Sequence, residues 1–464
     1  MSRQNIHAGG VSATGCPCPG GSQPLQLLIA GALAPLVVVF LVASFRQPLK
    51  VALPVYAALL PFGSGLTTGL PSAFGSVSSL AGVVLTLALT GQLMTSRRGS
   101  STLTSSLPVW LMFLAVAGAS TFWSIAPRVT VNSFIVLTGL TALFALLALS
   151  NIDRPTLDRT ENAIIIGAVI AVGYGLLQLF FLGGLPSSPE GAPRFGNGLL
   201  GPNNQAAALL LPLAIALART AARTRPWSRT GHAVVAAMML AGILLTGSRG
   251  GLLTAAVTVA LVVVLATRGR APLIGGCVVA AALLAVVLLV NPGGIGARQT
   301  GHEGSSGRSE VWRVGVHACQ TVCVAGSGWG TFGLVYERER ASVPDARVLR
   351  RGSTFEPHNI WLLAAVEAGF LGLLLMTAGL SLTLTDALRL PRAVRGPPLA
   401  ALVGTVMAGF FLSNLEFKFF WMVLTYVALT ANATGTGSRA PVASDSPERL
   451  PQIAEVSAMP ERRG

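Results

Sequence analysis

Long apolar stretches, separated by short polar connections, recur along nearly the whole chain of 464 residues. Each stretch is close to the roughly 20 residues that an α-helix needs to cross a bilayer. The pattern predicts an all-α, polytopic integral membrane bundle with 12 to 13 spans. The expected spans are 25–44, 51–70, 75–95, 107–123, 131–150, 163–185, 203–218, 232–247, 250–267, 272–290, 358–385, 398–415 and 417–433.

One polar connection, residues 292–357, is much longer than the others. Within it, residues 309–325 carry valines and alanines at helical spacing, which predicts an amphipathic helix lying over the bundle. The GSGWGTFG run that follows predicts a sharp turn, because glycine is frequent in turns. A phosphate-binding loop is the alternative, but the run lacks the GKS or GKT ending of such loops, so the turn is favoured.

The two ends of the chain differ from the apolar middle. Residues 1–24 and 434–464 are rich in Gly, Pro, Ser and charge, which is typical of disordered tails. We therefore divide the chain into two tails and one transmembrane domain, residues 25–433. Thirteen spans place the amino terminus outside the membrane, whereas twelve place it inside.

The composition agrees with a membrane protein. Apolar residues make up 52% of the chain and charged residues only 11%, against roughly 25% charged residues in soluble domains. The mean hydropathy is +0.67. A net charge of +15 suggests nucleic acid as a partner in a soluble protein, but here the arginines lie between apolar segments, where they set orientation. We expect a lipid bilayer and no nucleic acid as partner.

The distribution of Lys and Arg indicates which side the long loop faces. If residues 292–357 lie outside, the short inner connections hold three times as many of these residues as the outer segments, as the positive-inside rule requires. The inner set is Arg46, Lys50, Arg97, Arg98, Arg154, Arg159, Arg219, Arg223, Arg225, Arg229, Arg268, Arg270, Arg389, Arg392 and Arg395. The outer set is Arg3, Arg128, Arg194, Arg249 and Lys418. The long loop is therefore predicted to be extracytoplasmic.

Cysteines and acidic residues limit the chemistry. Cys319 and Cys323 lie one helical turn apart, and two small buried apolar side chains are favoured over a disulfide. No Cys/His metal spacing is found, so no metal or cofactor is expected. Nearly all acidic residues fall in connections or tails, except Glu367 and, at the edge of a span, Glu416. This argues against ion-coupled transport, which needs carboxylates inside the membrane.

Arginines and one histidine gather in the connections assigned to the outer face. Arg249 lies in the tight turn TGSRGG, Arg194 in the connection before GPNN, and Arg308 at the start of the loop helix. Guanidinium groups bind phosphate oxygens in a bidentate way. His358 opens a span in EPHNIW, and a histidine can take a proton from an attacking hydroxyl. Together these residues favour a lipid-diphosphate site.

Simpler roles are open for each of these side chains. Asn203 and Asn204 begin a helix, where backbone amides attract anions, but asparagine is also a common N-cap. Arg249 and Arg194 could extend toward the interface without a ligand, and His358 could hydrogen-bond its own helix end. Glu367 is expected to orient a neighbour or to pair with an arginine rather than to act as a base.

Four segments between residues 196 and 375 resemble, in order, the motifs of a known family. They are GNGLLGPNNQAAALLLPLAIAL (196–217), TGSRGGLLTAAV (246–257), GRSEVWRVGVHACQTVCVAGSGWGTFG (307–333) and EPHNIWLLAAVEAGFLGLLL (356–375). Their order and their placement around one outer loop resemble the superfamily of O-antigen ligases and polymerases. These are membrane glycosyltransferases that use undecaprenyl-diphosphate-linked glycans.

The resemblance implies a fold like that of the GT-C-type O-antigen ligases and a set of site residues. The matching positions are Arg249 in SRG, Arg308 before Trp312 in the loop helix, His358 and Asn359 in HN, and Glu367 further along; Arg194 is a looser match. Arg249, with Arg194 or Arg308, is then expected to hold the leaving diphosphate, and His358 to activate the acceptor. Asn203, Asn204, Asn359 and Trp312 are expected to contact the substrate.

The implied reaction moves a glycan from the lipid diphosphate to a hydroxyl of a glycan, lipid or protein, with inversion and without metal. It places the protein in a bacterial plasma membrane, with its site on the extracytoplasmic face and other polysaccharide-assembly proteins as partners. The motifs do not separate a ligase from a polymerase or a protein glycosyltransferase. The alternative function is a polysaccharide or lipid exporter or flippase without covalent chemistry.

Overall fold

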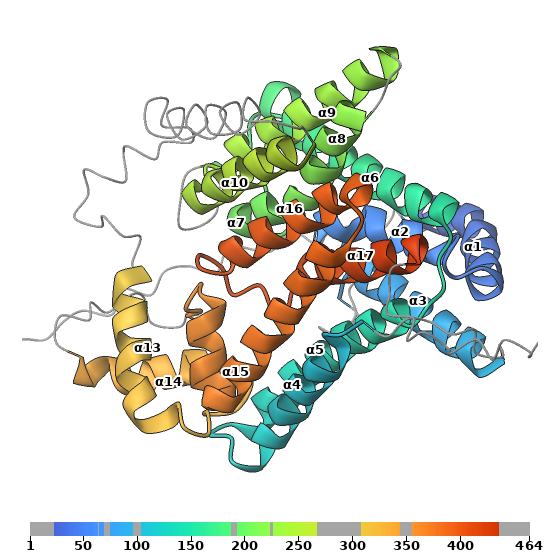
Figure 1. Cartoon of the computed structure of the whole chain (residues 1–464). Helices are drawn as coiled ribbons and strands as arrows, with labels where there is room; N and C mark the ends of the chain where they lie inside the picture. Colours follow the sequence, from blue (N-terminus) through green and yellow to red (C-terminus); the bar gives the residue numbers. More distant parts are fainter. Residues whose placement is uncertain are drawn as a thin grey trace, which may run out of the picture.

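The computed structural model describes residues 23–63, 65–68, 75–95, 104–186, 193–222, 226–266, 308–343 and 355–435. Within these ranges helices form a bundle joined by short loops (Figure 1), which confirms the predicted all-α class. The first helices are α1 (Gln23–Arg46), α2 (Ala52–Leu59), η1 (Leu60–Phe62), α3 (Val77–Thr95), α4 (Leu107–Ala119), η3 (Ser120–Phe122), α5 (Pro127–Ala148) and α6 (Arg154–Phe181). The others are α7 (Pro202–Ala208), α8 (Leu210–Ala222), α9 (Pro226–Leu245), α10 (Arg249–Ala266), α13 (Arg308–Val322), α14 (Phe332–Glu339), η4 (Arg340–Ser342), α15 (Ile360–Arg389), α16 (Arg392–Ala408) and α17 (Lys418–Thr434).

Seven of the described helices are long and apolar enough to cross a membrane. They are α3, α5, α6, the continuous stretch of α7 and α8, α9, α10 and α15. Shorter apolar helices cover 35–46, 52–62 and 107–122, so the span predicted at 51–70 is a shorter helix than expected. Large apolar side chains such as Leu87 and Ile135 are more than half exposed, which suits a lipid environment. The total of 12 to 13 spans stays a prediction, and the span expected at 272–290 lies outside the described residues.

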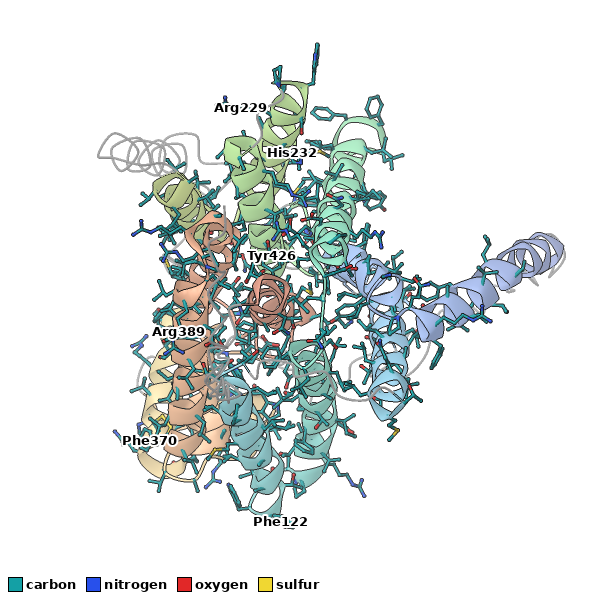
Figure 2. All side chains as sticks on the ribbon, turned by 45° about the vertical axis from the view of Figure 1, so that its right-hand side comes forward. Phe122, Arg229, His232, Phe370, Arg389 and Tyr426 are labelled. Carbon is teal, nitrogen blue, oxygen red and sulfur yellow. A yellow bond between two sulfur atoms is a disulfide. The ribbon has the colours of Figure 1, made fainter. Side chains whose placement is uncertain are left out.

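The loops that carry the candidate residues meet at one end of the bundle, here called the loop end. The start of α15 contacts the end of α16 there, because the Ile360 amide donates to the Gly409 carbonyl at 2.8 Å. At the opposite end, the Asn432 side chain at the end of α17 donates to the carbonyl of Ala148, where α5 ends, at 2.9 Å. Figure 2 shows Phe122 and Phe370 toward one end, and Arg229 and His232 toward the other.

Helix α6 begins at Arg154, nine residues before the predicted span. Asp153 caps it, because its carboxylate accepts from the Thr156 amide at 3.1 Å. The longer helix contains Glu161, which is buried and pairs with Arg219 at 2.7 Å. The prediction left Glu367 and, at the edge of a span, Glu416 as the acidic residues outside connections and tails, and it therefore missed Glu161. The partner arginine and the Tyr426 hydroxyl, 2.8 Å from the carboxylate, make this buried charge tolerable.

A second acidic residue also lies inside a helix. Asp386 belongs to the last turn of α15, which runs four residues beyond the predicted end of that span. The Ser105 hydroxyl before α4 donates to it at 2.6 Å. The sequence did not indicate that Glu161 and Asp386 lie inside helices, because the predicted spans cover only the most apolar part of α6 and α15.

The core near the loop end is aromatic. Trp110 of α4 stacks edge-on against Phe113, Phe420 and Trp421, with ring centroids 5.8, 6.3 and 5.2 Å away. Phe113 also contacts Trp329 of the glycine-rich turn at 5.5 Å. These rings join α4 and α17 to the loop segment and hold that segment against the bundle.

The predicted loop helix is present as α13, which packs its buried side chains Val311, Val314 and Ala318 on the bundle. Figure 1 shows α13 and α14 beside α15. Cys319 and Cys323 form a disulfide at the end of α13, so the expectation of two apolar thiols was wrong. Disulfides persist in oxidising compartments, which supports an extracytoplasmic position of this loop.

The contact between α6 and α2 depends on Gly167. A Cβ at this position would lie 2.0 Å from the Ala58 carbonyl oxygen, whereas a Cβ at Gly173 of the same helix meets its nearest atom at 3.6 Å. We expect Gly167→Leu to lower stability by about 3 kcal/mol or more, because the two backbones must separate, while Gly173→Leu stays near wild type. Thermal unfolding in detergent micelles, followed by tryptophan fluorescence, measures both. Equal effects of the two substitutions would contradict this packing.

Candidate functional site

The turn TGSRGG joins α9 to α10 at the loop end. The Ser248 hydroxyl accepts from the Gly251 amide at 3.1 Å and so caps the first turn of α10. Arg249 is the first residue of α10, and its side chain is exposed. The short turn therefore fixes the backbone of this exposed residue, Arg249, at the loop end.

Arg194 ties the connection before α7 to this turn. Its Nε donates to the Thr246 carbonyl at 2.6 Å, and its Nη2 donates to the Asn203 side chain at 3.3 Å. The Asn204 side chain donates to the Leu200 carbonyl at 3.4 Å. Three of the predicted contact residues thus hold their own loop together.

Arg308 begins α13 and reaches a crevice between α7, α10 and the end of α16. Asn203, Ser248, Gly250 and Phe411 also line this crevice. The structure therefore brings Arg308, the SRG turn and the first of the two asparagines to one place. The crevice has a volume of about 10 Å³, close to the space that one water molecule needs.

The EPHN segment lies between α13 and α15. The Trp312 indole donates to the Pro357 carbonyl at 2.6 Å. Asn359 caps α15, because its side-chain oxygen accepts from the amides of Trp361 and Leu362, both at 3.0 Å. His358 is thus held between two anchored residues, one tied to α13 and one to α15.

The backbone of His358 has a φ of +48°, the one positive value of a non-glycine residue in the described ranges. Side chains rarely adopt this left-handed conformation, which costs of order 1 to 3 kcal/mol and is found often at functional sites. The anchors at Pro357 and Asn359 hold the strained backbone in place. The imidazole is therefore positioned by backbone geometry as well as by packing.

The electrostatics around His358 favour a neutral imidazole. Burial, together with the Arg308 charge, lowers the pKa of His358 to about 4. Burial also lowers the pKa of Arg308, but a guanidinium starts from so high a value that it stays charged in proteins. A cation and a proton-accepting imidazole are thus placed within electrostatic reach of each other.

Glu367 lies in α15 beneath the glycine-rich turn. Its two carboxylate oxygens accept from the backbone amides of Gly330 and Phe332, both at 2.9 Å. The side chain is buried. The GSGWGTFG run is thus a turn clamped by a carboxylate, and α14 follows it.

The neighbouring carboxyl group of Glu416 was assigned no role from the sequence. Burial raises the pKa of Glu416 to about 7, and the nearby Glu356 carboxylate adds to the shift. The sequence does not indicate that Glu356 and Glu416 lie near each other, because 60 residues separate them. In the described ranges, no group of three His, Cys, Asp or Glu side chains could hold a metal ion.

The strain at His358 gives a test of its conformation. Glycine takes a positive φ without penalty, so His358→Gly should be more stable than His358→Ala by about 1 kcal/mol. Both variants remove the imidazole, so the difference reports the backbone alone. Thermal unfolding of the two purified variants measures it. An alanine variant as stable as the glycine variant, or more stable, would disprove the strained conformation.

A family model described as O-antigen ligase matches residues 234–377, about a third of the chain. The matched region includes Arg249, Arg308, His358 and Glu367, whereas Arg194 and the asparagines before α8 precede it. No curated protein matches the chain significantly. The family match confirms the resemblance noted in the sequence: residues 234–377 are similar to the O-antigen ligase family.

Proposed function

We propose that this protein is a membrane glycosyltransferase that moves a glycan from a lipid-diphosphate carrier to an acceptor hydroxyl, as a ligase or polymerase of surface polysaccharide. The observation that carries the proposal is the meeting of Arg308, Asn203 and the SRG turn in one crevice, with a neutral His358 within reach of the Arg308 charge. The family match supports a ligase or polymerase as the class of protein.

The diphosphate is proposed to bind at the crevice. Arg308 and Arg249 supply guanidinium groups, which pair with phosphate oxygens in a bidentate way. The amino terminus of the 18-residue helix α10 adds the positive end of its dipole. A diphosphate is larger than the present crevice, so its entry requires the side chains of Arg308 and Phe411 to move apart.

The transfer itself is proposed to be a single displacement. The acceptor oxygen bonds to the anomeric carbon from the side opposite the diphosphate, and the bond between that carbon and the diphosphate oxygen breaks. The departing diphosphate keeps the electron pair, stabilised by the arginines. The acceptor proton moves to the neutral imidazole of His358.

The other predicted site residues are proposed to act as positioning residues. Both oxygens of Glu367 bind backbone amides, so this carboxylate shapes the turn under the site rather than taking a proton. Asn359 and Trp312 hold the backbone on either side of His358. Arg194, Asn203 and Asn204 hold the loop that forms one wall of the crevice.

The site is proposed to face the extracytoplasmic side of a bacterial plasma membrane. The disulfide of α13 and the excess of Lys and Arg in the connections at the opposite end support this orientation. Acceptor lipids or glycans carried across the membrane would then reach the loop end directly.

Transfer by purified full-length protein tests the proposal. With a labelled lipid-diphosphate glycan and a mixture of hydroxyl acceptors, we expect Arg308→Ala, Arg249→Ala and His358→Ala each to reduce product at least about 100-fold, since each removes a group that acts on the reacting atoms. Arg313→Ala removes an exposed arginine of the same helix α13 and serves as the matched control. The acceptor that is glycosylated separates ligase, polymerase and protein glycosyltransferase.

Two results would contradict the proposal. Wild-type levels of product from the His358 and Arg308 variants would show that these residues do not form the site of transfer. Movement of the lipid-linked glycan across vesicles by the wild type, with no new glycosidic bond in the same assay, would favour an exporter instead.

The pH dependence gives a separate test. An unshifted histidine base would lose activity as the pH falls through about 6.5. Because the pKa of His358 lies at about 4, we expect kcat/KM, which reports the free enzyme, to stay flat from pH 7.5 down to about 5.5. The acid limb should appear only below that range. An acid limb centred near pH 6.5 would mean that His358 is not the base or is not buried as described.

A further inference from the structure

A second, larger cavity lies on the other side of the segment that leads into α7. Its volume is about 580 Å³, within the range of pockets that enclose small-molecule ligands. Residues of helices α2, α3, α5 and the start of α17 line it, together with Leu199 and Leu200. None of the groups assigned to the transfer reaction lines it.

The cavity opens sideways between apolar helices. Its walls are largely aliphatic, and the lining residues Val83 and Leu87 of α3 and Ile135 of α5 are 37%, 56% and 54% exposed. Both helices are long and apolar enough to cross a membrane. The exposed rim therefore faces the region that lipid chains occupy, and hydrocarbon can enter without crossing water.

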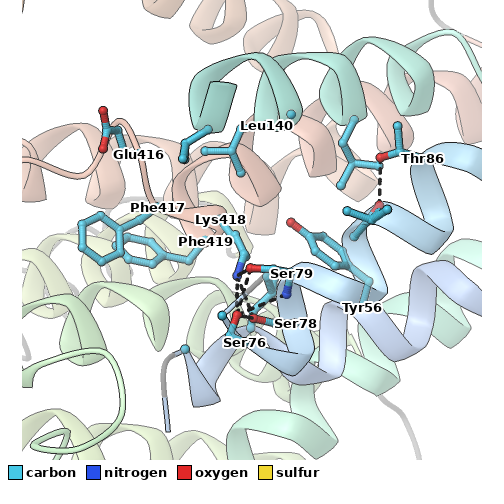
Figure 3. Close-up of a pocket in the computed structure, with 18 of the residues that line it drawn as sticks. Tyr56, Ser76, Ser78, Ser79, Thr86, Leu140, Glu416, Phe417, Lys418 and Phe419 are labelled. Atoms are coloured by element: carbon cyan, nitrogen blue, oxygen red, sulfur yellow. Dashed lines mark hydrogen bonds between the residues drawn. The ribbon is translucent and has the colours of Figure 1, made fainter. Parts of the chain in front are cut away.

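A cationic cluster lies at one end of this apolar cavity. The Lys418 ammonium donates to the hydroxyls of Ser76, Ser78 and Ser79 at 3.0, 2.8 and 2.8 Å, and Figure 3 shows the four side chains together. Two further contacts join the serines to one another and use at most two of their three hydroxyl protons. The cluster presents a positive charge and a hydrogen-bond donor to the cavity.

The charge of Lys418 has no acidic counterpart in the described ranges, where no carboxylate lies within ion-pair distance of its ammonium. Serine hydroxyls solvate an ammonium but do not neutralise it, and an unneutralised charge beside apolar walls is costly. Glu416 lines the same cavity but points away from Lys418 in Figure 3. Its raised pKa, about 7, leaves much of this carboxyl uncharged at neutral pH.

We propose that this cavity binds a membrane lipid with a phosphate headgroup, whose chain enters between α3 and α5 and whose phosphate contacts the cluster of Lys418 with Ser76, Ser78 and Ser79. The apolar walls supply affinity for the chain, and the cluster selects an anionic headgroup. This site is separate from the transfer crevice, so the proposal holds whether or not the protein transfers a glycan.

Lipid binding to the full-length protein in detergent micelles tests it. The probes are phosphatidic acid and phosphatidylcholine that each carry one oleoyl chain and the same fluorescent chain, so that they differ only in the headgroup. We expect the phosphatidic acid to bind at least about tenfold tighter, because its phosphate carries more negative charge, whereas the phosphate of phosphatidylcholine is accompanied by its own choline cation. Lys418→Met should abolish this preference.

A cavity-filling variant makes the test independent of the lysine. A Cβ at Gly139 of α5, which lines the cavity, meets no atom within 4 Å, so Gly139→Leu occupies the cavity without a clash. We expect Gly139→Leu to weaken the binding of both lipids about tenfold. Gly91→Leu on α3 adds the same side chain at an equally open position outside the cavity and should bind as wild type does. Leucine is also the better helix former, so both variants should fold.

Three outcomes would overturn the proposal. Equal affinities for phosphatidic acid and phosphatidylcholine would show that the cluster does not select the headgroup. Wild-type affinity in Gly139→Leu would place any bound lipid elsewhere. Inorganic phosphate that displaces phosphatidic acid at millimolar concentration would show a plain anion site in which the chain contributes nothing.

Discussion

The loop end of this protein depends on how the glycine-rich turn enters helix α15. The amides of Ser327 and Gly328 donate to the carbonyls of Val366 and Glu367 at 2.8 and 3.0 Å, and the Phe370 amide donates to the Cys323 carbonyl at 2.7 Å. Helix α15 breaks at Gly369, where φ is +73°, to receive these bonds. A Cβ on Gly369 would lie 2.7 Å from the backbone of the turn, so only glycine allows this approach. The turn satisfies the carbonyls of Val366 and Glu367 and the amide of Phe370 beside the break, which helps the kink to be tolerated inside a membrane bundle.

This junction sets the position of the candidate site. The turn is continuous with α13, so fixing the turn on α15 also fixes the helix that begins with Arg308. The same α15 begins with the Asn359 cap next to His358. Arg308 and His358 lie 50 residues apart in sequence but are held by one helix and the loop that it binds. The Glu367 carboxylate makes this junction more rigid, because it accepts hydrogen bonds from two backbone amides of the turn.

The sequence predicted the features that depend on local pattern. The loop helix followed from helical spacing, and the turn TGSRGG with the HN pair followed from their short distance to apolar spans. The features that it did not predict depend on tertiary contacts. Glu161 was missed because the Asp153 cap starts α6 earlier than hydropathy indicates, and its burial is tolerable only beside Arg219 of α8. The sequence also does not show that the Trp312 indole donates to a backbone carbonyl, or that two backbone amides donate to the side-chain oxygen of Asn359.

The two polar centres at the loop end face opposite sides of the segment that runs from Leu199 into α7. Asn203 lines the crevice of Arg308, while Leu199 and Leu200 line the cavity of Lys418. The Asn204 side chain bonds the Leu200 carbonyl, and Arg194 bonds Asn203, so the segment is braced on both sides. The diphosphate proposed to bind in the crevice would move the side chains of Arg308 and Phe411 apart. Because the segment forms a wall of both spaces, a change of its position alters the volume of the lipid cavity as well. Arg194 joins this segment to the SRG turn through the carbonyl of Thr246.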